Sequence, residues 1–374
     1  MGATTESLDA VGQVVDPGCR VQEEIGEILP YMPDSAARTF VEYARSRGPG
    51  APRANVYSGV SAFPLADYKR AQGGDEPVLD GAVVETIGAE TVDDRRADYG
   101  IDRCVLNPTE NLGLAAVNND RYAVAIARGY NDWLLDQVDG RDALAGNALV
   151  APQAPDRAAA EIDRVADEDD VVGVHLPATG LRPLAGHVSY DPIYEAAAAA
   201  GLPVTLYPTV GLKSYHQQYY SAEWFAEDYT YHPAFAHIEH VTSLLFEGVP
   251  VKYPDLRFLL QGAGLGFGPY LVQRLDDHYL ELGYEIPVLE ELPSKYLDRQ
   301  FLWCTSPIGT ESRRADYLAT MIRMLGVDNV AYTSDLPHQF GGSPAALVDR
   351  LDGAFSTEEL AQLLGGNAAR VYGV

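Results

Sequence analysis

The sequence predicts a single (β/α)8 barrel (TIM barrel), an α/β fold in which each of eight parallel strands is followed by helical chain. Short β-branched segments alternate with amphipathic helical segments along the chain, which indicates a parallel sheet. Eight such units in 374 residues are typical of a closed barrel. A doubly wound open sheet would require a GxGxxG turn after the first strand, and the sequence has none. We therefore expect one domain over residues 1–374, with residues 1–13 as an N-terminal extension.

The first half of the chain supplies four of the expected strands, at Val11–Asp16, Asp102–Leu106, Ala143–Val150 and Val171–Leu176. Helical periodicity predicts helices between them, at Glu23–Met32, Asp34–Arg47, Val84–Asp98, Asp120–Asp139 and Asp156–Asp167. Residues 48–80 carry glycine, proline and polar residues with little periodicity. We interpret that segment as a long loop over the barrel mouth.

The second half supplies the other four strands, at Pro203–Leu206, Leu256–Leu260, Gln300–Cys304 and Asn329–Thr333. The expected helices are Pro192–Ala200, His232–Gly248, Pro269–Leu282, Arg313–Leu325, Pro344–Leu351 and Thr357–Leu364. Gly201 is a good helix stop, because glycine readily adopts the left-handed conformation that ends many helices. Residues 208–231 are rich in aromatic side chains and predict a second insertion, which serves as a lid or a packing segment.

The charge is strongly acidic, with 54 Asp and Glu against 27 Lys and Arg and a net charge of -27. A phosphate backbone would be repelled, so a nucleic-acid partner is not expected. The acidic residues are spread along the chain, which favours a halophilic protein with an acidic surface over one acidic partner-binding patch.

If the surface is adapted to high salt, the melting temperature should rise as KCl is raised into the molar range. Salt would then screen the repulsion among the surface carboxylates. Thermal denaturation followed across a KCl series measures this, and a flat or falling curve would remove the idea.

Location and redox state follow from what the sequence lacks. No stretch of about 18 apolar residues is present, so no membrane partner is expected. Residues 1–14 lack the basic and then apolar pattern of a signal peptide, which favours a cytoplasmic protein. Cys19, Cys104 and Cys304 are far apart and in no CxxC spacing, so we expect reduced thiols in or near the core.

Active sites of such barrels lie at the carboxyl ends of the strands. The side chains expected there are Asp16, Cys19, Arg20, Gln22, Asn107, His175, Tyr207, Gln261, Cys304, Thr305 and Asp335. Asp335 follows an apolar strand, and a carboxylate there must find a cation or several donors. It is a candidate metal ligand, general base or structural acceptor, and His338 lies three residues further along.

Histidines supply the other candidates for proton transfer. Strand alternation places His175 with Gly173 on one face, which can line the barrel interior or contact a helix. His232 begins an expected helix on which His237 and His240 share a face. No HExxH is present, and neither GxSxG nor a P-loop occurs.

The segment Asn329 to His338 (NVAYTSDLPH) resembles the strand-eight signature SD-x-PH of the amidohydrolase-related family that includes aminocarboxymuconate-semialdehyde decarboxylase. Gly365 to Val374 (GGNAARVYGV) resembles the C-terminal helix of that family, and Lys252 to Phe258 (KYPDLRF) resembles its entry to strand six. Arg274 to Asp276 and Asp102 to Pro108 also match. The resemblance covers most of the chain from about residue 14, with the motifs in the right order.

The resemblance implies a (β/α)8 barrel of the metal-dependent hydrolase type, acting as a hydrolase or a non-oxidative decarboxylase on a small substrate. It implies a divalent metal such as zinc, held by His-x-His at strand one, a strand-five His and the strand-eight Asp. A strand-six His commonly acts as an acid or base. A homodimer would also fit the family.

This sequence departs from that pattern at most of these positions. The His-x-His positions fall on Arg20 and Gln22, the strand-five position on Tyr207 and the strand-six position on Gln261. Only Asp335 carries over as a metal ligand, and arginine cannot ligate because it stays protonated. We therefore hypothesise that an Arg20–Asp335 contact replaces the metal.

Three functions remain open from the sequence. The first is a metal-dependent enzyme for a small carboxylate, amide or ester, with Asp335, His175 and His232 catalytic. In that reading Arg20, Gln22, Tyr207, Gln261 and His338 bind the small-molecule substrate. The second is a metal-independent enzyme using the same residues. The third is a metal-free, catalytically lapsed barrel that binds a small ligand or a partner protein. A rearranged metal site of His175, His232 and Asp335 would require those side chains to meet.

Overall fold

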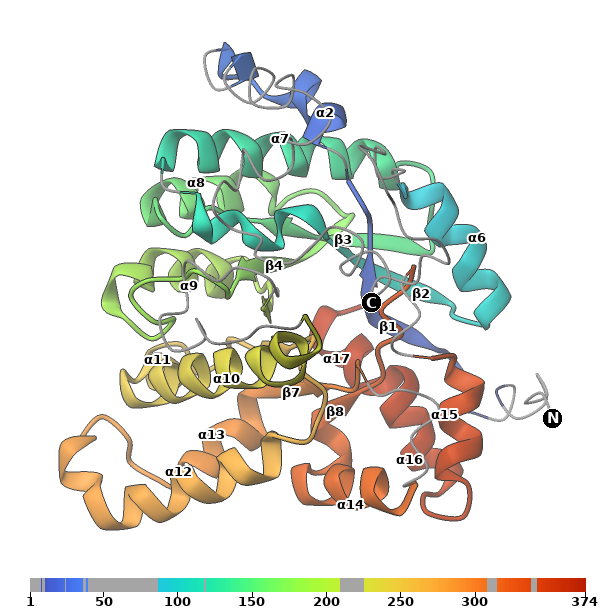
Figure 1. Cartoon of the computed structure of the whole chain (residues 1–374), viewed down its shortest axis with the longest axis vertical. Helices are drawn as coiled ribbons and strands as arrows, with labels where there is room; N and C mark the ends of the chain where they lie inside the picture. Colours follow the sequence, from blue (N-terminus) through green and yellow to red (C-terminus); the bar gives the residue numbers. More distant parts are fainter. Residues whose placement is uncertain are drawn as a thin grey trace.

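The computed structural model has a central ring of strands surrounded by helices (Figure 1). It describes residues 8, 11–23, 25–35, 38–39, 87–117, 119–208, 225–307, 315–337 and 342–374. His338, the expected loop at residues 48–80 and most of the aromatic insertion, residues 209–224, lie outside the described residues.

The eight strands are all parallel and follow one another around the sheet in chain order, as a (β/α)8 barrel requires. They are β1 (Val15–Arg20), β2 (Arg103–Asn107), β3 (Leu144–Leu149), β4 (Val171–Pro177), β5 (Val204–Tyr207), β6 (Phe258–Leu260), β7 (Phe301–Cys304) and β8 (Val330–Ala331). Beyond β8, the backbone N–H of Arg20 donates to the carbonyl of Leu336 at 2.6 Å, which brings the two ends of the sheet together. The barrel is therefore nearly closed.

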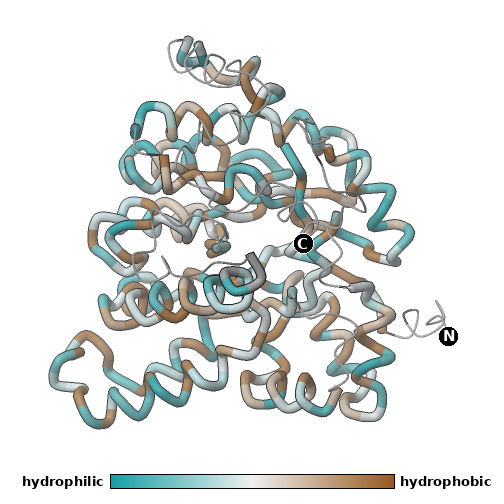
Figure 2. Tube along the Cα trace, viewed as in Figure 1, coloured by the Kyte–Doolittle hydropathy of each residue, from teal (hydrophilic) through white to brown (hydrophobic). Residues whose placement is uncertain are grey.

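Helices cover the outside of the ring. The longer ones are α6 (Ala89–Tyr99), α7 (Asp120–Val138), α8 (Pro155–Val165), α9 (Asp191–Ala199), α10 (Phe225–Phe246), α12 (Gly268–Leu282), α13 (Pro293–Gln300), α14 (Ala315–Leu325) and α15 (Pro344–Leu351). Hydrophilic and hydrophobic turns alternate along them (Figure 2), as expected for helices that bury one face against a sheet. None of the helices among the described residues is long and apolar enough to cross a bilayer.

The first strand lies further along the chain than predicted, at Val15–Arg20 instead of Val11–Asp16. Pro17 and Gly18 are poor strand residues, yet β1 passes through both at a shift in its register with β2. Gly18 is needed because a Cβ atom there would lie 2.6 Å from the Thr333 side chain. Because β1 lies further along the chain than predicted, Arg20 is its last residue and not a residue beyond it.

Other predicted boundaries also moved. The predicted helix His232–Gly248 spans Phe225–Phe246 instead, with Pro233 inside it. The predicted Glu23–Met32 helix is a short α2 (Ile25–Ile28) followed by a 3-10 turn, η1 (Leu29–Tyr31). Helix α13 was not predicted. The predicted stop at Gly201 is confirmed, because this glycine has a φ of +69° directly after α9.

The last helix, α17 (Asn367–Tyr372), packs against the interior of the barrel. Its residues Ala368 and Tyr372 join a buried cluster with Val15, Val105, Ala145, Val172, Leu259, Leu302, Cys304 and Ala331 from the strands. The C-terminus accordingly lies beside β1 (Figure 1). Inward-facing residues therefore fill the ring with a packed core.

Candidate active site

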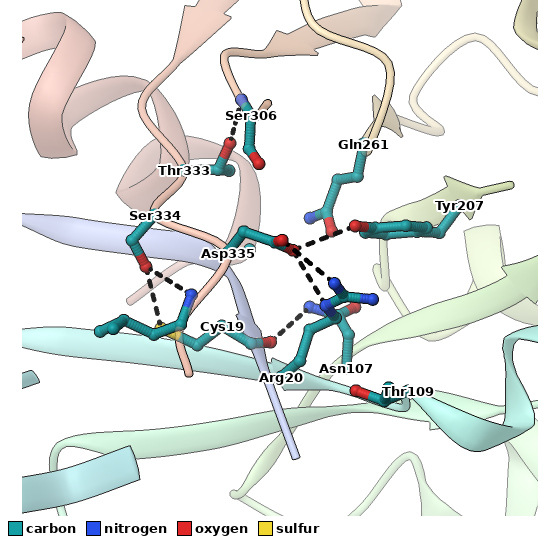
Figure 3. Close-up of polar contacts among 12 residues, drawn as sticks. Cys19, Arg20, Asn107, Thr109, Tyr207, Gln261, Ser306, Thr333, Ser334 and Asp335 are labelled. Carbon is teal, nitrogen blue, oxygen red and sulfur yellow. Dashed lines mark hydrogen bonds and ion pairs between the residues drawn. The ribbon is translucent and has the colours of Figure 1, made fainter. Parts of the chain in front are cut away.

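Arg20 and Asp335 form a buried ion pair where β1 ends and where the chain leaves β8 (Figure 3). Arg20 Nε lies 2.9 Å from Asp335 Oδ1, and Arg20 Nη2 donates to Oδ2 at 3.1 Å. The two residues are only 7% and 3% exposed. The contact predicted between them is thus confirmed, as an ion pair with one hydrogen bond from Nη2. The described cysteines Cys19, Cys104 and Cys304 are free and buried, also as expected.

The backbone at Asp335 is unusual. Its φ of +63° is the only positive value at a non-glycine residue in the described part of the chain. Aspartate tolerates this left-handed region better than most residues, but the conformation still has to be held by its surroundings. Two contacts from β1 do so: Ser334 N donates to Asp16 Oδ2 at 3.0 Å, and Arg20 N donates to Leu336 O. The fold therefore fixes the backbone on both sides of the carboxylate.

Asp16 is a fully buried carboxylate. From the sequence it was expected at a strand end, without a role. Besides Ser334 N, it accepts from Gly18 N at 2.8 Å and from Cys19 Sγ at 3.3 Å. Burial raises the pKa of Asp16, and these hydrogen bonds oppose that shift. Asp16 therefore joins the turn before Asp335 to the bulge in β1.

Replacing Asp16 with Ala should lower the free energy of unfolding by about 2–4 kcal/mol. The change leaves the buried amides of Gly18 and Ser334 without their acceptor, at a cost of about 1–3 kcal/mol for each group. Urea denaturation measures the difference. Asp93→Ala is the control, because Asp93 pairs at the surface with Arg96 and its loss should cost less than about 1 kcal/mol. Equal effects for the two variants would contradict the role given to Asp16.

Tyr207, the last residue of β5, contacts both members of the ion pair. Its hydroxyl donates to Asp335 Oδ1 at 3.1 Å, and its ring centroid lies 5.1 Å from Arg20 Cζ. Burial raises the pKa of the Tyr207 hydroxyl well above its ordinary value, so it stays a donor. Burial also raises the pKa of Asp335, whereas Arg20 and Tyr207 oppose that shift.

His175 lines the barrel interior, the first of the two positions that strand alternation left open. Its ring stacks on the Tyr207 ring with centroids 6.3 Å apart, and its Nδ1 lies 3.2 Å from Asn107 Oδ1. Burial, assisted by the nearby Arg20 charge, lowers the pKa of His175 to about 3. The imidazole is therefore neutral near physiological pH and cannot act there as a cationic acid.

Gln261 and Gln22 have different surroundings. Gln261 follows β6, is 1% exposed and donates through Nε2 to Pro17 O at 2.7 Å. Gln22 lies beyond β1, where its backbone pairs with Ile87. The amide nitrogen of Gln22 has no hydrogen-bond partner within the described ranges. Gln261 thus belongs to the mouth of the barrel close to Tyr207 (Figure 3). Gln22 is buried beyond the end of β1, two residues after Arg20.

His232 lies in a second group, on α10. Its Nε2 is 3.5 Å from Thr179 Oγ1. His240, on the same helix, donates through Nε2 to Ala178 O at 2.9 Å. The rearranged site of His175, His232 and Asp335 is not supported, since no group of three or more potential ligands for a metal occurs among the described residues.

Several polar residues of the interior were not singled out from the sequence. Asn147 Nδ2 donates to Asn107 Oδ1 at 2.8 Å and to Tyr372 OH at 3.2 Å, and Tyr372 OH lies 3.0 Å from Thr205 Oγ1. Asn147 and Thr205 occupy inward-facing strand positions, a signal that alternation could have given. Tyr372 carries no such signal, because it comes from a helix that enters the barrel.

A divalent metal does not fit the residues at the family's ligand positions. Arg20 has no lone pair to offer, and its guanidinium already occupies both oxygens of Asp335. Tyr207 is held as a neutral donor, and Gln261 is a weak ligand tied to Pro17. Zinc normally takes three or four His, Cys or carboxylate ligands. Only Asp335 is of that kind here.

Residues 91–374 match the model of the Amidohydro_2 family of amidohydrolases, and the chain belongs to that family. The match spans most of the chain, from α6 to the last residue. No curated protein matches the sequence.

Solved structures similar to the chain share its fold. An amidohydrolase from Mycobacterium avium subsp. paratuberculosis is 19% identical with a TM-score of 0.72, covering 96% of this chain and 99% of that one. The 5-carboxyvanillate decarboxylase of Sphingomonas paucimobilis is 23% identical with a TM-score of 0.66, covering 97% and 99%. A dihydroxybenzoic acid decarboxylase from Polaromonas sp. JS666, with bound manganese and 2-nitroresorcinol, is 20% identical with a TM-score of 0.67, covering 97% of each.

Proposed function

We propose that this chain is a metal-independent enzyme of the amidohydrolase family that decarboxylates a small carboxylate at the barrel mouth. The observation that carries the proposal is the Arg20–Asp335 ion pair, which joins two positions where the family resemblance implies metal ligands. Arg20 would hold the substrate carboxylate and Asp335 would supply the proton. An aromatic substrate is favoured, because the stacked rings of Tyr207 and His175 lie beside the pair and the similar decarboxylases act on aromatic acids.

The charges of the site support this assignment. His175 and Tyr207 are neutral, so Arg20 and Asp335 are the charged groups that define the pair. An incoming carboxylate would compete with Asp335 for the guanidinium. Because two carboxylates at one buried cation repel each other, Asp335 would take up a proton as the substrate binds. The bound state would then hold Arg20 charged, the substrate ionised and Asp335 neutral.

The proposed reaction follows from that state. The bond between the substrate carbon and its carboxylate breaks, CO2 leaves, and the electron pair stays on the carbon. The proton of Asp335 is transferred to that carbon, which leaves a neutral product and an ionised Asp335. The Arg20–Asp335 ion pair then re-forms, so net charge is the same before and after.

Hydrolysis is less well supported by the same contacts. It requires a base to activate water. Asp335 Oδ1 and Oδ2 already accept from Arg20 and Tyr207, and neither Tyr207 nor Gln261 replaces a base. The same occupancy of both oxygens favours one second candidate, a non-catalytic barrel that binds a carboxylate without turning it over.

Metal analysis and ligand assays on the purified protein test the proposal. We expect less than a stoichiometric amount of metal, binding of benzoate or hydroxybenzoates in EDTA, and release of CO2 from at least one of them. Arg20→Gln should lose binding by 10-fold or more, and Asp335→Asn should bind but release no CO2. Arg121→Gln, at an exposed arginine paired with Asp34, is the control.

Each other outcome has a distinct meaning. One metal ion per chain with activity lost in EDTA would overturn the metal-independent assignment. Binding that depends on Arg20 without CO2 release would favour the non-catalytic barrel. Failure of these carboxylates to bind would contradict the proposed substrate class.

A further inference from the structure

Two buried hydrogen-bond acceptors lie on the strands at either side of Tyr207. They are His175 Nε2 on β4 and Gln261 Oε1 directly after β6, and neither has a hydrogen-bond partner in the part of the chain that the structure describes. The two residues are 0% and 1% exposed. A buried acceptor without a partner costs about 1–3 kcal/mol, so two of them beside one ion pair require an explanation.

The contacts of Asn107 identify His175 Nε2 as the acceptor. Asn107 Nδ2 donates to the backbone carbonyls of Pro17, Cys19 and Val105, at 2.9, 3.1 and 3.2 Å. This orients Asn107 Oδ1 toward His175, where it can only accept. His175 Nδ1 therefore carries the proton, and in a neutral ring Nε2 is left with a lone pair.

A second donor confirms the orientation of the Asn107 amide. Asn147 Nδ2 also donates to Asn107 Oδ1, at 2.8 Å, and is held in turn by Tyr372 OH. The tautomer of His175 is thus set by a chain of contacts that begins on α17. The Tyr207 ring stacked on His175 fixes the plane of the imidazole as well.

The amide nitrogen of Gln261 fixes the orientation of its side chain. Its Nε2 donates to Pro17 O at 2.7 Å, which assigns the remaining amide atom as Oε1. The side chain reaches toward Tyr207 and Asp335 (Figure 3). Gln261 Oε1 can accept hydrogen bonds, as His175 Nε2 can, and Arg20 supplies the complementary donor group for an anion.

We propose that His175 Nε2 and Gln261 Oε1 form a subsite that accepts hydrogen bonds from an O–H or N–H group of the ligand whose carboxylate binds Arg20. The inference rests on the proposed function and makes His175 a specificity-determining residue, not a proton-transfer group. A ligand without the donor would leave the acceptors buried and unpaired. We expect such a ligand to bind about 10- to 100-fold more weakly for each acceptor that it leaves unpaired.

The experiment compares matched probes by calorimetry: 2-, 3- and 4-hydroxybenzoate, each against the corresponding methoxybenzoate, which keeps the oxygen and lacks the donor. At one ring position or more, the hydroxy compound should bind at least 10-fold more tightly. His175→Phe keeps a ring to stack on Tyr207 and should abolish that preference. His175→Gln, which can donate to Asn107 and present an oxygen, should restore it in part.

Gln261→Met tests the second acceptor and should reduce the same preference. His278→Phe is the matched control, because His278 is a surface histidine on α12 near Glu281. Nitrogen-15 NMR of the free protein tests the tautomer independently of any ligand and should show His175 protonated at Nδ1.

The outcomes separate this inference from the proposed function. Hydroxy and methoxy probes that bind equally well would overturn the subsite and leave the carboxylate enzyme standing. A His175 protonated at Nε2 would also overturn it. If no probe binds wild-type protein, the proposed function fails, and the subsite fails with it.

Discussion

The Arg20→Met variant should lose about 3–5 kcal/mol of unfolding free energy, because it leaves the buried Asp335 carboxylate without its cation. Ion pairs in the interior contribute little net stability compared with apolar replacements, but removing one partner is costly. Among the residues that the structure describes, the donor left to Asp335 would be the Tyr207 hydroxyl, which cannot neutralise a charge. Chemical denaturation at pH 7 measures the loss.

The double variant Arg20→Met/Asp335→Asn should recover most of that loss. Asparagine removes the charge and still accepts the left-handed backbone at this position, where φ is +63°. The comparison with Arg121→Met is informative, because Arg121 is 60% exposed in its pair with Asp34 and its loss should cost less than about 1 kcal/mol. A double variant no more stable than Arg20→Met would show that the charge of Asp335 is not the cause.

The second large effect is a loss of stability on acidification below about pH 6.5. Burial lowers the pKa of His237 and of His240 to about 4 and that of His175 to about 3, from an ordinary value of 6.5. The unfolded chain therefore binds more protons than the folded chain over this range, so unfolding becomes more favourable as the pH falls. Each histidine contributes about 1.4 kcal/mol per pH unit between its two pKa values.

Glu23 acts in the opposite direction. It is fully buried, accepts from Thr109 N and Asn111 N, and burial raises its pKa to about 7. As the pH falls, the folded chain protonates Glu23 at a higher pH than the unfolded chain does. Glu23 therefore adds stability between about pH 7 and about pH 4.5, and this gain offsets the loss from one histidine. Burial also raises the pKa of Asp16 and of Asp335, which likewise adds stability as the pH falls. The measured slope is therefore the loss from the three histidines less the gain from these buried carboxyl groups.

Unfolding free energies at pH 7.5, 6.0 and 5.0 measure the slope. His237→Gln should reduce it, because glutamine can still donate to Gln261 O but does not titrate. His278→Gln, at the exposed helix surface, should leave it unchanged. A slope that His237→Gln leaves unchanged would show that this imidazole takes up its proton in the folded state as readily as in the unfolded chain.

The sequence alone predicted the eight strands, because β-branched segments alternating with amphipathic segments are a local signal. Strand β1 was misplaced because its course depends on distant residues. Position 18 requires glycine because Thr333 packs against it, and the carbonyl of Pro17 accepts hydrogen bonds from Asn107 and Gln261. Neither reason is visible from residues 11–20.

The ion pair was predictable because the family resemblance put Asp335 at one metal-ligand position and an arginine at another. The fixed tautomer of His175 was not predictable. It depends on the amide orientation of Asn107 and on Asn147 and Tyr372, which come from two strands and a helix. The sequence has no periodic pattern that predicts such a network, because its members meet only after the barrel has formed.

The ion pair joins residues 315 positions apart in the chain, and Asp16 meets Ser334 across 318. Segments so distant come together only when the first strand meets the chain that follows the last one, so a barrel that has not closed does not contain the site. A ligand that binds Arg20 should therefore slow global unfolding and leave the fraying of outer helices unaffected. Hydrogen exchange with and without ligand would then report on folding cooperativity across the entire barrel.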